Sequence, residues 1–148
     1  MRTIEKTVFK FEELSDSAKE RARRWYREGM DYDYCFETTI EDAAQIGLEI
    51  VSLSDHRANK GNFTQSAHQA ALAILANHGS MCGTFATARD YLIARHNHNA
   101  DDADFLRALL EDYRITLNRE IEYQQSNEAV DESILSNEYE FSEEGDRA

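Results

Sequence analysis

The chain contains no proline, only two cysteines and no long apolar run. Without proline, glycine and asparagine must end the helices, and no stiff linker divides the 148 residues. Cys35 and Cys82 are too few to build the disulfide framework that is typical of small secreted domains. The first residues lack the pattern of a signal peptide, and no apolar run approaches about 20 residues. We therefore expect a cytoplasmic protein that does not span a membrane.

The composition provides enough apolar residues for one core. Hydrophobic residues make up 41% of the chain, which holds seven Phe, seven Tyr and one Trp. A chain of this length buries roughly 70% of its unfolded surface, so it needs no disulfide or metal to be stable. We predict a single domain over residues 1–148, in which residues 143–148 fray at the end.

Two segments near the ends of the chain, residues 7–12 and 139–141, alternate as half-buried strands do. Together they place four aromatic residues on their buried faces: Phe9, Phe11, Tyr139 and Phe141. Pairing the two segments would bury these rings together and bring Lys10 near Glu138 or Glu140. The sequence therefore predicts a small sheet that joins the two ends of the chain.

Between these segments, apolar residues recur mostly with the period of amphipathic helices. Capping residues and glycines place helices from Ser15 to Gly29, from Thr38 to Gly47, over 64–78, from Thr84, over 101–125, and after Ser126. Residues 48–53 are predicted to be a strand and residues 54–62 a polar loop. In the last helix the apolar side is predicted to be Ala129, Val130, Ile134 and Leu135. We predict an α+β fold, which is a mostly helical single domain with a small, largely antiparallel sheet that pairs the N- and C-terminal strands.

Acidic residues are concentrated in the last third of the chain. Residues 101–148 hold 15 Asp and Glu against 4 Lys and Arg, a net charge of −11 out of −13 for the whole chain. This charge argues against direct binding to nucleic acid or to an anionic membrane. A concentrated acidic region instead attracts cationic surfaces from a distance.

The predicted long helix gathers several of these carboxylates on one side. At 100° per residue, Asp104, Glu111 and Glu122 fall within about 20° of one another. They lie away from the leucine stripe of the same helix, which is Leu106, Leu110 and Leu117. Such a helix spans about 37 Å, which is enough to offer carboxylates over several phosphate spacings of duplex DNA. The candidate partner-binding residues are Asp104, Glu111, Asp112, Glu120, Glu122, Glu128, Asp131 and Glu132. The alternative is that these residues form the ordinary solvated face of an acidic protein.

Other clusters have simpler explanations than catalysis or metal binding. Asp101, Asp102 and Asp104 would stabilise a helix N-terminus through the helix dipole without any metal ion. His78, Cys82 and the 96–98 segment lack the spacing of a zinc site. No catalytic or nucleotide-binding motif occurs, so we predict no enzyme activity, no catalytic residue, no cofactor and no metal. The arginines and lysine of residues 19–27 are expected to pair with Glu20, Glu28 or the acidic C-terminal region.

Two parts of the sequence resemble a known family. Residues 11–19 (FEELSDSAK) and 23–29 (RRWYREG), with residues 126–132 (SNEAVDE) and 137–145 (NEYEFSEEG), are similar to the two ends of small phage- and plasmid-encoded proteins. Members of this family are often labelled antitoxin of a toxin–antitoxin stability system. The resemblance implies a small acidic accessory protein that is carried on a mobile element.

Together these observations predict a non-enzymatic phage or mobile-element protein that binds and inhibits a host defence or nucleic-acid-binding protein. The protein would be an inhibitor of the anti-CRISPR or anti-restriction type, whose acidic C-terminal surface binds a cationic groove of the target. DNA mimicry is one form of this function. The alternative is an antitoxin that neutralises a basic cognate toxin by direct binding. The sequence leaves open whether the protein forms a homodimer.

Overall fold

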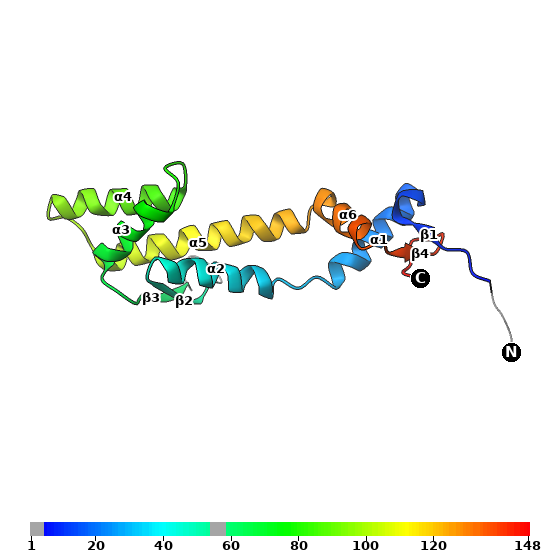
Figure 1. Ribbon diagram of the computed structural model, residues 1–148, viewed down its shortest axis with the longest axis horizontal. Coiled ribbons are helices and arrows are strands. Elements are labelled where there is room, and N and C mark those ends of the chain that lie inside the picture. The colour runs from blue at the N-terminus through cyan, green and yellow to red at the C-terminus, as the bar shows by residue number, and fades with distance from the viewer. Residues whose placement is uncertain (1–4, 54–58) are drawn as a thin grey trace. The chain divides into compact units, whose positions relative to one another are not determined.

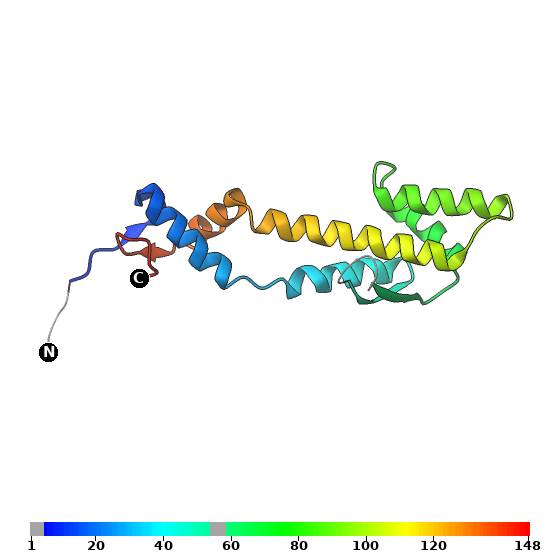
Figure 2. The same ribbon diagram turned by 180° about the vertical axis from the view of Figure 1, so that it is seen from behind.

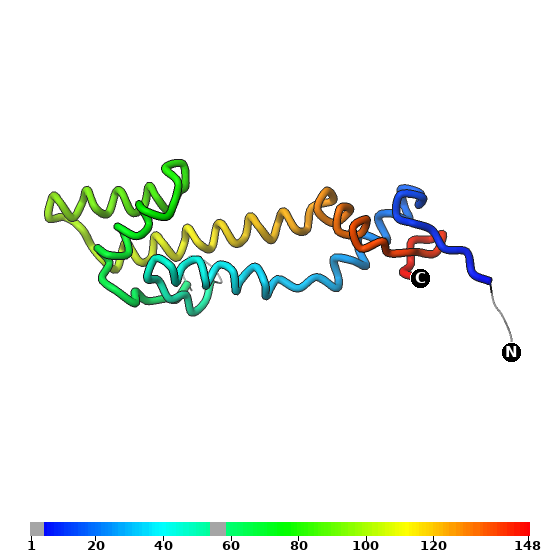
Figure 3. The backbone as a smooth tube through the Cα atoms, in the orientation of Figure 1, coloured from blue at the N-terminus to red at the C-terminus, as the bar shows by residue number. Residues whose placement is uncertain are grey.

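The computed structural model describes residues 5–53 and 59–148 (Figure 1). The chain divides into two compact units, which we describe separately. The terminal unit consists of residues 1–32 and 121–148, and the central unit of residues 33–120. The backbone trace shows that both ends of the chain enter the terminal unit (Figure 3). The single domain over residues 1–148 stays a prediction, because a division into compact units does not show which parts fold independently.

The terminal unit is built on a short antiparallel pairing between the two ends of the chain. Strand β1 (Phe9–Lys10) pairs with β4 (Glu140–Phe141), with Phe9 opposite Phe141 and Lys10 opposite Glu140. The predicted sheet between the N- and C-terminal strands is thus confirmed. The first strand is shorter than predicted because the chain turns into a 3-10 helix, η1 (Phe11–Glu13). The ring of Phe11 is nevertheless buried, with its centroid 6.4 Å from that of Phe141.

Two helices complete the terminal unit, α1 (Asp16–Glu28) and α6 (Asn127–Ser136). Both predicted N-caps are confirmed: the hydroxyl of Ser15 accepts a hydrogen bond from Ala18 N–H and that of Ser126 from Ala129 N–H, each at 3.2 Å. The helices pack on the aromatic pair through Ala18, Ala22, Val130 and Ile134, and Leu14, which lies between η1 and α1, belongs to the same core.

Backbone hydrogen bonds hold the C-terminal tail in place in the structure, and the fraying of residues 143–148 stays a prediction. The Ser142 N–H donates to the carbonyl of Asp146 at 2.7 Å, and the Ala148 N–H donates to the carbonyl of Glu140 at 2.9 Å. Gly145 is buried at a φ of +94°, where a Cβ atom would lie 2.1 Å from the carbonyl oxygen of Ala18. The tail is held because glycine allows the chain to turn directly against α1.

The central unit contains α2 (Asp33–Gln45), β2 (Leu48–Ser52), β3 (Lys60–Phe63), α3 (Ala67–Asn77), α4 (Gly83–His96) and most of α5 (Asp102–Gln124). Strands β2 and β3 pair antiparallel, with Leu48 opposite Phe63, and they lie beside α2 (Figure 2). The core gathers apolar residues from all six elements, among them Ala43, Leu48, Ile74, Ala88 and Leu109. Both sheets are small and antiparallel, so the α+β fold class is confirmed.

Three sequence predictions in the central unit need correction. Helix α2 begins at Asp33, so Thr38 lies within the helix and does not cap it, although Gly47 follows the helix at a φ of +79° as expected. Strand β3 occupies part of the predicted polar loop 54–62, and residues 54–58 lie outside the described residues. The buried side of α5 is wider than its leucine stripe, because Phe105 stacks on Tyr91 with a centroid distance of 4.1 Å. Within the described parts of the chain, no helix is both long and apolar enough to cross a bilayer.

Candidate partner-binding surface

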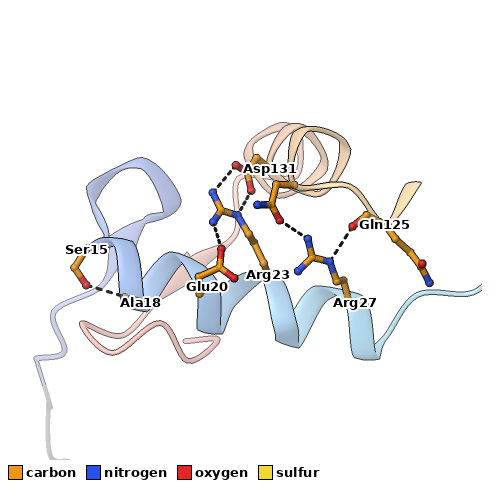
Figure 4. A network of polar contacts seen from close by, with 8 residues as sticks. Ser15, Ala18, Glu20, Arg23, Arg27, Gln125 and Asp131 are labelled. Carbon is orange, nitrogen blue, oxygen red and sulfur yellow. Dashed lines mark hydrogen bonds and ion pairs between the residues drawn. The ribbon is translucent and has the colours of Figure 1, made fainter. Parts of the chain in front are cut away.

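Several basic residues of α1 contact the acidic C-terminal segment (Figure 4). Arg23 donates to Asp131 through two nitrogens, Nε to Oδ1 at 2.6 Å and Nη2 to Oδ2 at 2.7 Å, and it also pairs with Glu20. Arg27 donates from Nε to the carbonyl of Gln125 at 3.0 Å. The predicted pairing within the molecule is confirmed for Arg23, whereas Arg27 bonds the carbonyl of Gln125 and the side-chain oxygen of Asn127 and no carboxylate of the described residues. Asp131 therefore holds α1 and α6 together.

The Arg23–Asp131 pair is well shielded from water. Only 15% of the Arg23 side chain and 27% of the Asp131 side chain are exposed, and the guanidinium lies 5.5 Å from the centroid of the Phe11 ring. The hydrogen bond with Asp131 is the main reason why the pKa of Arg23 is raised above its already high ordinary value. A second pair, Arg21 Nε to Asp146 Oδ1 at 2.7 Å, is exposed and connects α1 to the tail.

The predicted acidic side of α5 is largely neutralised by the arginines of that helix. Asp104 pairs with Arg107, and Glu111 pairs with Arg114, whose Nε lies 2.9 Å from Oε2 of Glu111. Glu111 also accepts a hydrogen bond from the side-chain amide of Asn59 at 3.2 Å. Two of the three carboxylates that are predicted to share this side, Asp104 and Glu111, therefore have arginine partners, because residues three apart on a helix are neighbours.

Asp112 lies at the edge of the core. Its Oδ2 accepts a hydrogen bond from the hydroxyl of Thr87, on α4, at 2.6 Å. Burial raises the pKa of Asp112, while the hydrogen bond from Thr87 acts in the opposite direction. Asp112 therefore contributes little to an outward acidic face. Glu120, the last residue of the central unit, is exposed on α5.

The remaining predicted residues, Glu122, Glu128 and Glu132, belong to the terminal unit and are exposed. Residues 121–148 carry nine carboxylates and a single cation, Arg147. Asp131 and Asp146 pair with arginines of α1. The other seven carboxylates are exposed and make no ion pair within the described residues: Glu122, Glu128, Glu132, Glu138, Glu140, Glu143 and Glu144.

Part of this acidic excess surrounds an apolar residue. Glu128, Glu132 and Leu135 follow the i, i+4, i+7 spacing of one helix face, opposite the buried face of α6. Leu135 is 43% exposed, although the sequence analysis assigns it to the buried side. It borders a groove of about 210 Å³ that Glu138 also lines. We call Glu128, Glu132, Leu135 and Glu138 the α6 face.

The sequence analysis predicts only part of the α6 face. Glu128 and Glu132 are among the predicted residues, whereas Leu135 and Glu138 are not. The missed signal is the helical spacing of Leu135 from the two glutamates, which was readable in the sequence. A face that combines carboxylates with one exposed leucine offers both long-range attraction and an apolar anchor.

The structure also gives simpler roles to the clusters considered for metal binding. The carboxylate of Asp101 accepts hydrogen bonds from the N–H groups of Ala103 and Asp104, at 2.8 and 3.1 Å, as a helix cap does. The Nδ1 of His78 and the Sγ of Cys82 lie 3.5 Å apart. In residues 5–53 and 59–148, no group of three or more potential metal ligands is suitably placed.

Comparisons with family models, with curated proteins and with solved structures find no match for this chain.

Proposed function

We propose that the protein is a non-enzymatic accessory protein of a phage or other mobile element, and that it binds and inhibits a host defence or nucleic-acid-binding protein. The α6 face would contact a cationic groove of that partner. The observation that carries this proposal is the set of seven exposed carboxylates in residues 121–148 that make no ion pair in the part of the chain that the structure describes. The family resemblance of the two ends of the chain supports the assignment to a mobile element.

The contacts narrow the eight candidate residues to those that are available to a partner. Asp131 stabilises the terminal unit, Asp104 and Glu111 have arginine partners, and Asp112 is half-buried. Glu120, Glu122, Glu128 and Glu132 are exposed, and the last three make no ion pair with the described residues. Exposed charges at an interface act mainly on the rate of association and on its dependence on salt. We therefore expect fast, salt-sensitive binding with a smaller apolar contribution from Leu135.

The first experiment captures the partner and then tests the face. The full chain is used to isolate its partner from a bacterial host lysate, and association rates are measured by surface plasmon resonance over a range of ionic strength. The test variant is Glu128→Lys with Glu132→Lys. The matched control is Glu37→Lys with Glu41→Lys, which are exposed carboxylates at the same i, i+4 spacing on α2.

Both double variants change the net charge equally, so they differ only in position. We expect the α6 variant to lower the association rate about tenfold or more and to flatten its salt dependence. The α2 control should change the rate by less than about twofold. Equal effects of the two variants, or a salt-independent wild-type rate, would contradict the proposal. Competition by duplex DNA for the same partner would favour DNA mimicry.

The antitoxin alternative uses the same surface but a different partner. A short toxin gene next to the coding sequence, and growth inhibition by that toxin that co-expression relieves, would establish it. Relief that the α6 variant abolishes and the α2 control preserves would assign the α6 face to toxin binding. A neighbourhood of phage early genes without such a toxin would favour the inhibitor of a host protein.

A further inference from the structure

The central unit contains a second candidate site, a cavity of about 840 Å³ bordered by α3, α4 and the start of α5. Three of the five histidines of the chain line it, together with a permanently charged arginine. The polar lining residues are His68, Tyr91, Arg95, His96, His98 and Asp102. Arg95 and Asp102 offset each other in formal charge, so the three histidines are what distinguishes this cavity in a chain with a net charge of −13. The acidic C-terminal surface does not explain it.

The carboxylate in the lining has a partner within the protein. The hydroxyl of Tyr91 donates to Oδ1 of Asp102 at 2.5 Å. Burial and Asp102 raise the pKa of Tyr91, whereas Arg95 acts in the opposite direction. The Tyr91–Asp102 hydrogen bond occupies one oxygen of the acid, while Arg95, His96 and His98 line the cavity and are exposed.

His68 lines the cavity from α3 and carries a ring nitrogen without a partner. Its Nδ1 atom is buried and has no hydrogen-bond partner within the described residues. A buried ring nitrogen without a partner is costly, and water or a bound ligand usually satisfies it. Because Nδ1 has almost no accessible surface, a ligand in the cavity would reach this atom only after the His68 ring turns.

The donor set suits a phosphate better than a carboxylate. An arginine fork and several imidazole N–H groups can serve three phosphate oxygens, whereas a carboxylate offers only two oxygens. The cavity has the size of a small-molecule site, and Leu92 and Ala100 add apolar lining for an organic group. The net negative charge of the protein opposes a long polyanion such as nucleic acid.

We propose that this cavity binds a small phosphate monoester, with Arg95 as the principal phosphate ligand and His96 and His98 as additional donors. The site is separate from the α6 face, so the failure of one proposal leaves the other unaffected. Inorganic phosphate and adenosine monophosphate serve as probes, and acetate serves as the carboxylate comparison. Binding to the full chain is followed by isothermal titration calorimetry and by phosphorus NMR.

The test variants are Arg95→Gln and His98→Gln, and the control is Arg89→Gln. Arg89 lies on the same helix, is exposed and is not among the residues that line the cavity. We expect adenosine monophosphate to bind more tightly than phosphate, and acetate not to bind. Arg95→Gln should weaken binding by about tenfold or more, which is the effect of losing a charge-assisted hydrogen bond. His98→Gln should weaken it less, and Arg89→Gln by less than about twofold.

Several outcomes would overturn the proposal. They are no binding of either phosphate probe, acetate binding equal to that of phosphate, or equal losses in Arg95→Gln and Arg89→Gln. Tighter binding of a phosphorylated oligonucleotide than of adenosine monophosphate would also reject the small ligand. Circular dichroism of each variant checks that the helices are intact, and because Arg95, His98 and Arg89 are exposed, folding should not change.

Discussion

Replacing Arg23 with methionine should destabilise the terminal unit much more than the same change at Arg21. Methionine keeps most of the apolar stem but removes both hydrogen bonds to Asp131 and the contact of the guanidinium with Phe11. Asp131 would then be a carboxylate that is 27% exposed and has lost its partner. Arg21 and Asp146 are 57% and 55% exposed, so water replaces their ion pair at little cost.

The burial of the two pairs sets the expected magnitudes. Breaking a fully buried ion pair costs about 3–5 kcal/mol, and breaking an exposed pair costs about 0–1 kcal/mol. The Arg23–Asp131 pair lies between these limits, and its bidentate geometry places it nearer the upper one. We expect Arg23→Met to lower the free energy of unfolding by about 2–3 kcal/mol, and Arg21→Met by less than about 1 kcal/mol.

The single tryptophan of the chain provides the assay. Trp25 lies in the terminal unit, with its ring centroid 5.2 Å from that of Tyr139 and 5.8 Å from that of Phe141. Its fluorescence during urea denaturation therefore reports on the unfolding of this unit. A double-mutant cycle of Arg23→Met with Asp131→Ala should give a coupling energy of about 1–2 kcal/mol. Equal losses in Arg23→Met and Arg21→Met, or a coupling near zero, would refute the reasoning.

Two further substitutions test the tail and the half-buried carboxylate. Gly145→Ala should lower the free energy of unfolding by about 2 kcal/mol, because residue 145 has a positive φ and the added Cβ would clash with Ala18. The same substitution should speed hydrogen exchange of the Ala148 amide. The control is Gly79→Ala, which should have neither effect because no other part of the described chain lies near the added Cβ. Asp112→Asn should stabilise the protein at neutral pH, because a raised pKa means that ionisation of Asp112 opposes folding. This gain should shrink as the pH falls through the raised pKa of Asp112 towards the ordinary range of aspartate, because the wild-type carboxyl is then protonated, and denaturation over that pH range measures it.

Local signals in the sequence identify the elements of the terminal unit well. The hydroxyl caps of Ser15 and Ser126 and the aromatic alternation at the chain ends depend on neighbouring residues only. Such local signals do not predict burial where contacts with residues distant in the sequence determine it. Phe105 is buried because Tyr91 stacks on one side of it and Phe63 packs within 5.6 Å, and the periodicity of one helix does not show which elements cover it.

The candidate surface is predicted in part for a related reason. The acidic excess of residues 121–148 can be counted in the sequence, but the choice of Asp131 as the partner of Arg23 depends on how α1 packs on α6. By contrast, Arg107 and Arg114 follow Asp104 and Glu111 by three residues, so their pairing could have been predicted. Helical spacing also favoured grouping Leu135 with Glu128 and Glu132, against its assignment to the core.

The distribution of charge within the terminal unit bears on whether its acidic surface is functional. Five basic residues lie on α1, yet Asp131 and Asp146 are the carboxylates of residues 121–148 that pair with them. The seven exposed carboxylates of this segment repel one another, and this repulsion opposes the compact fold. A cationic partner would remove this repulsion when it binds. Part of its binding free energy would therefore come from the loss of the electrostatic repulsion that destabilises the unbound protein. Added salt should therefore stabilise the unbound terminal unit while it slows association, whereas a merely solvated acidic face accounts for the first effect alone.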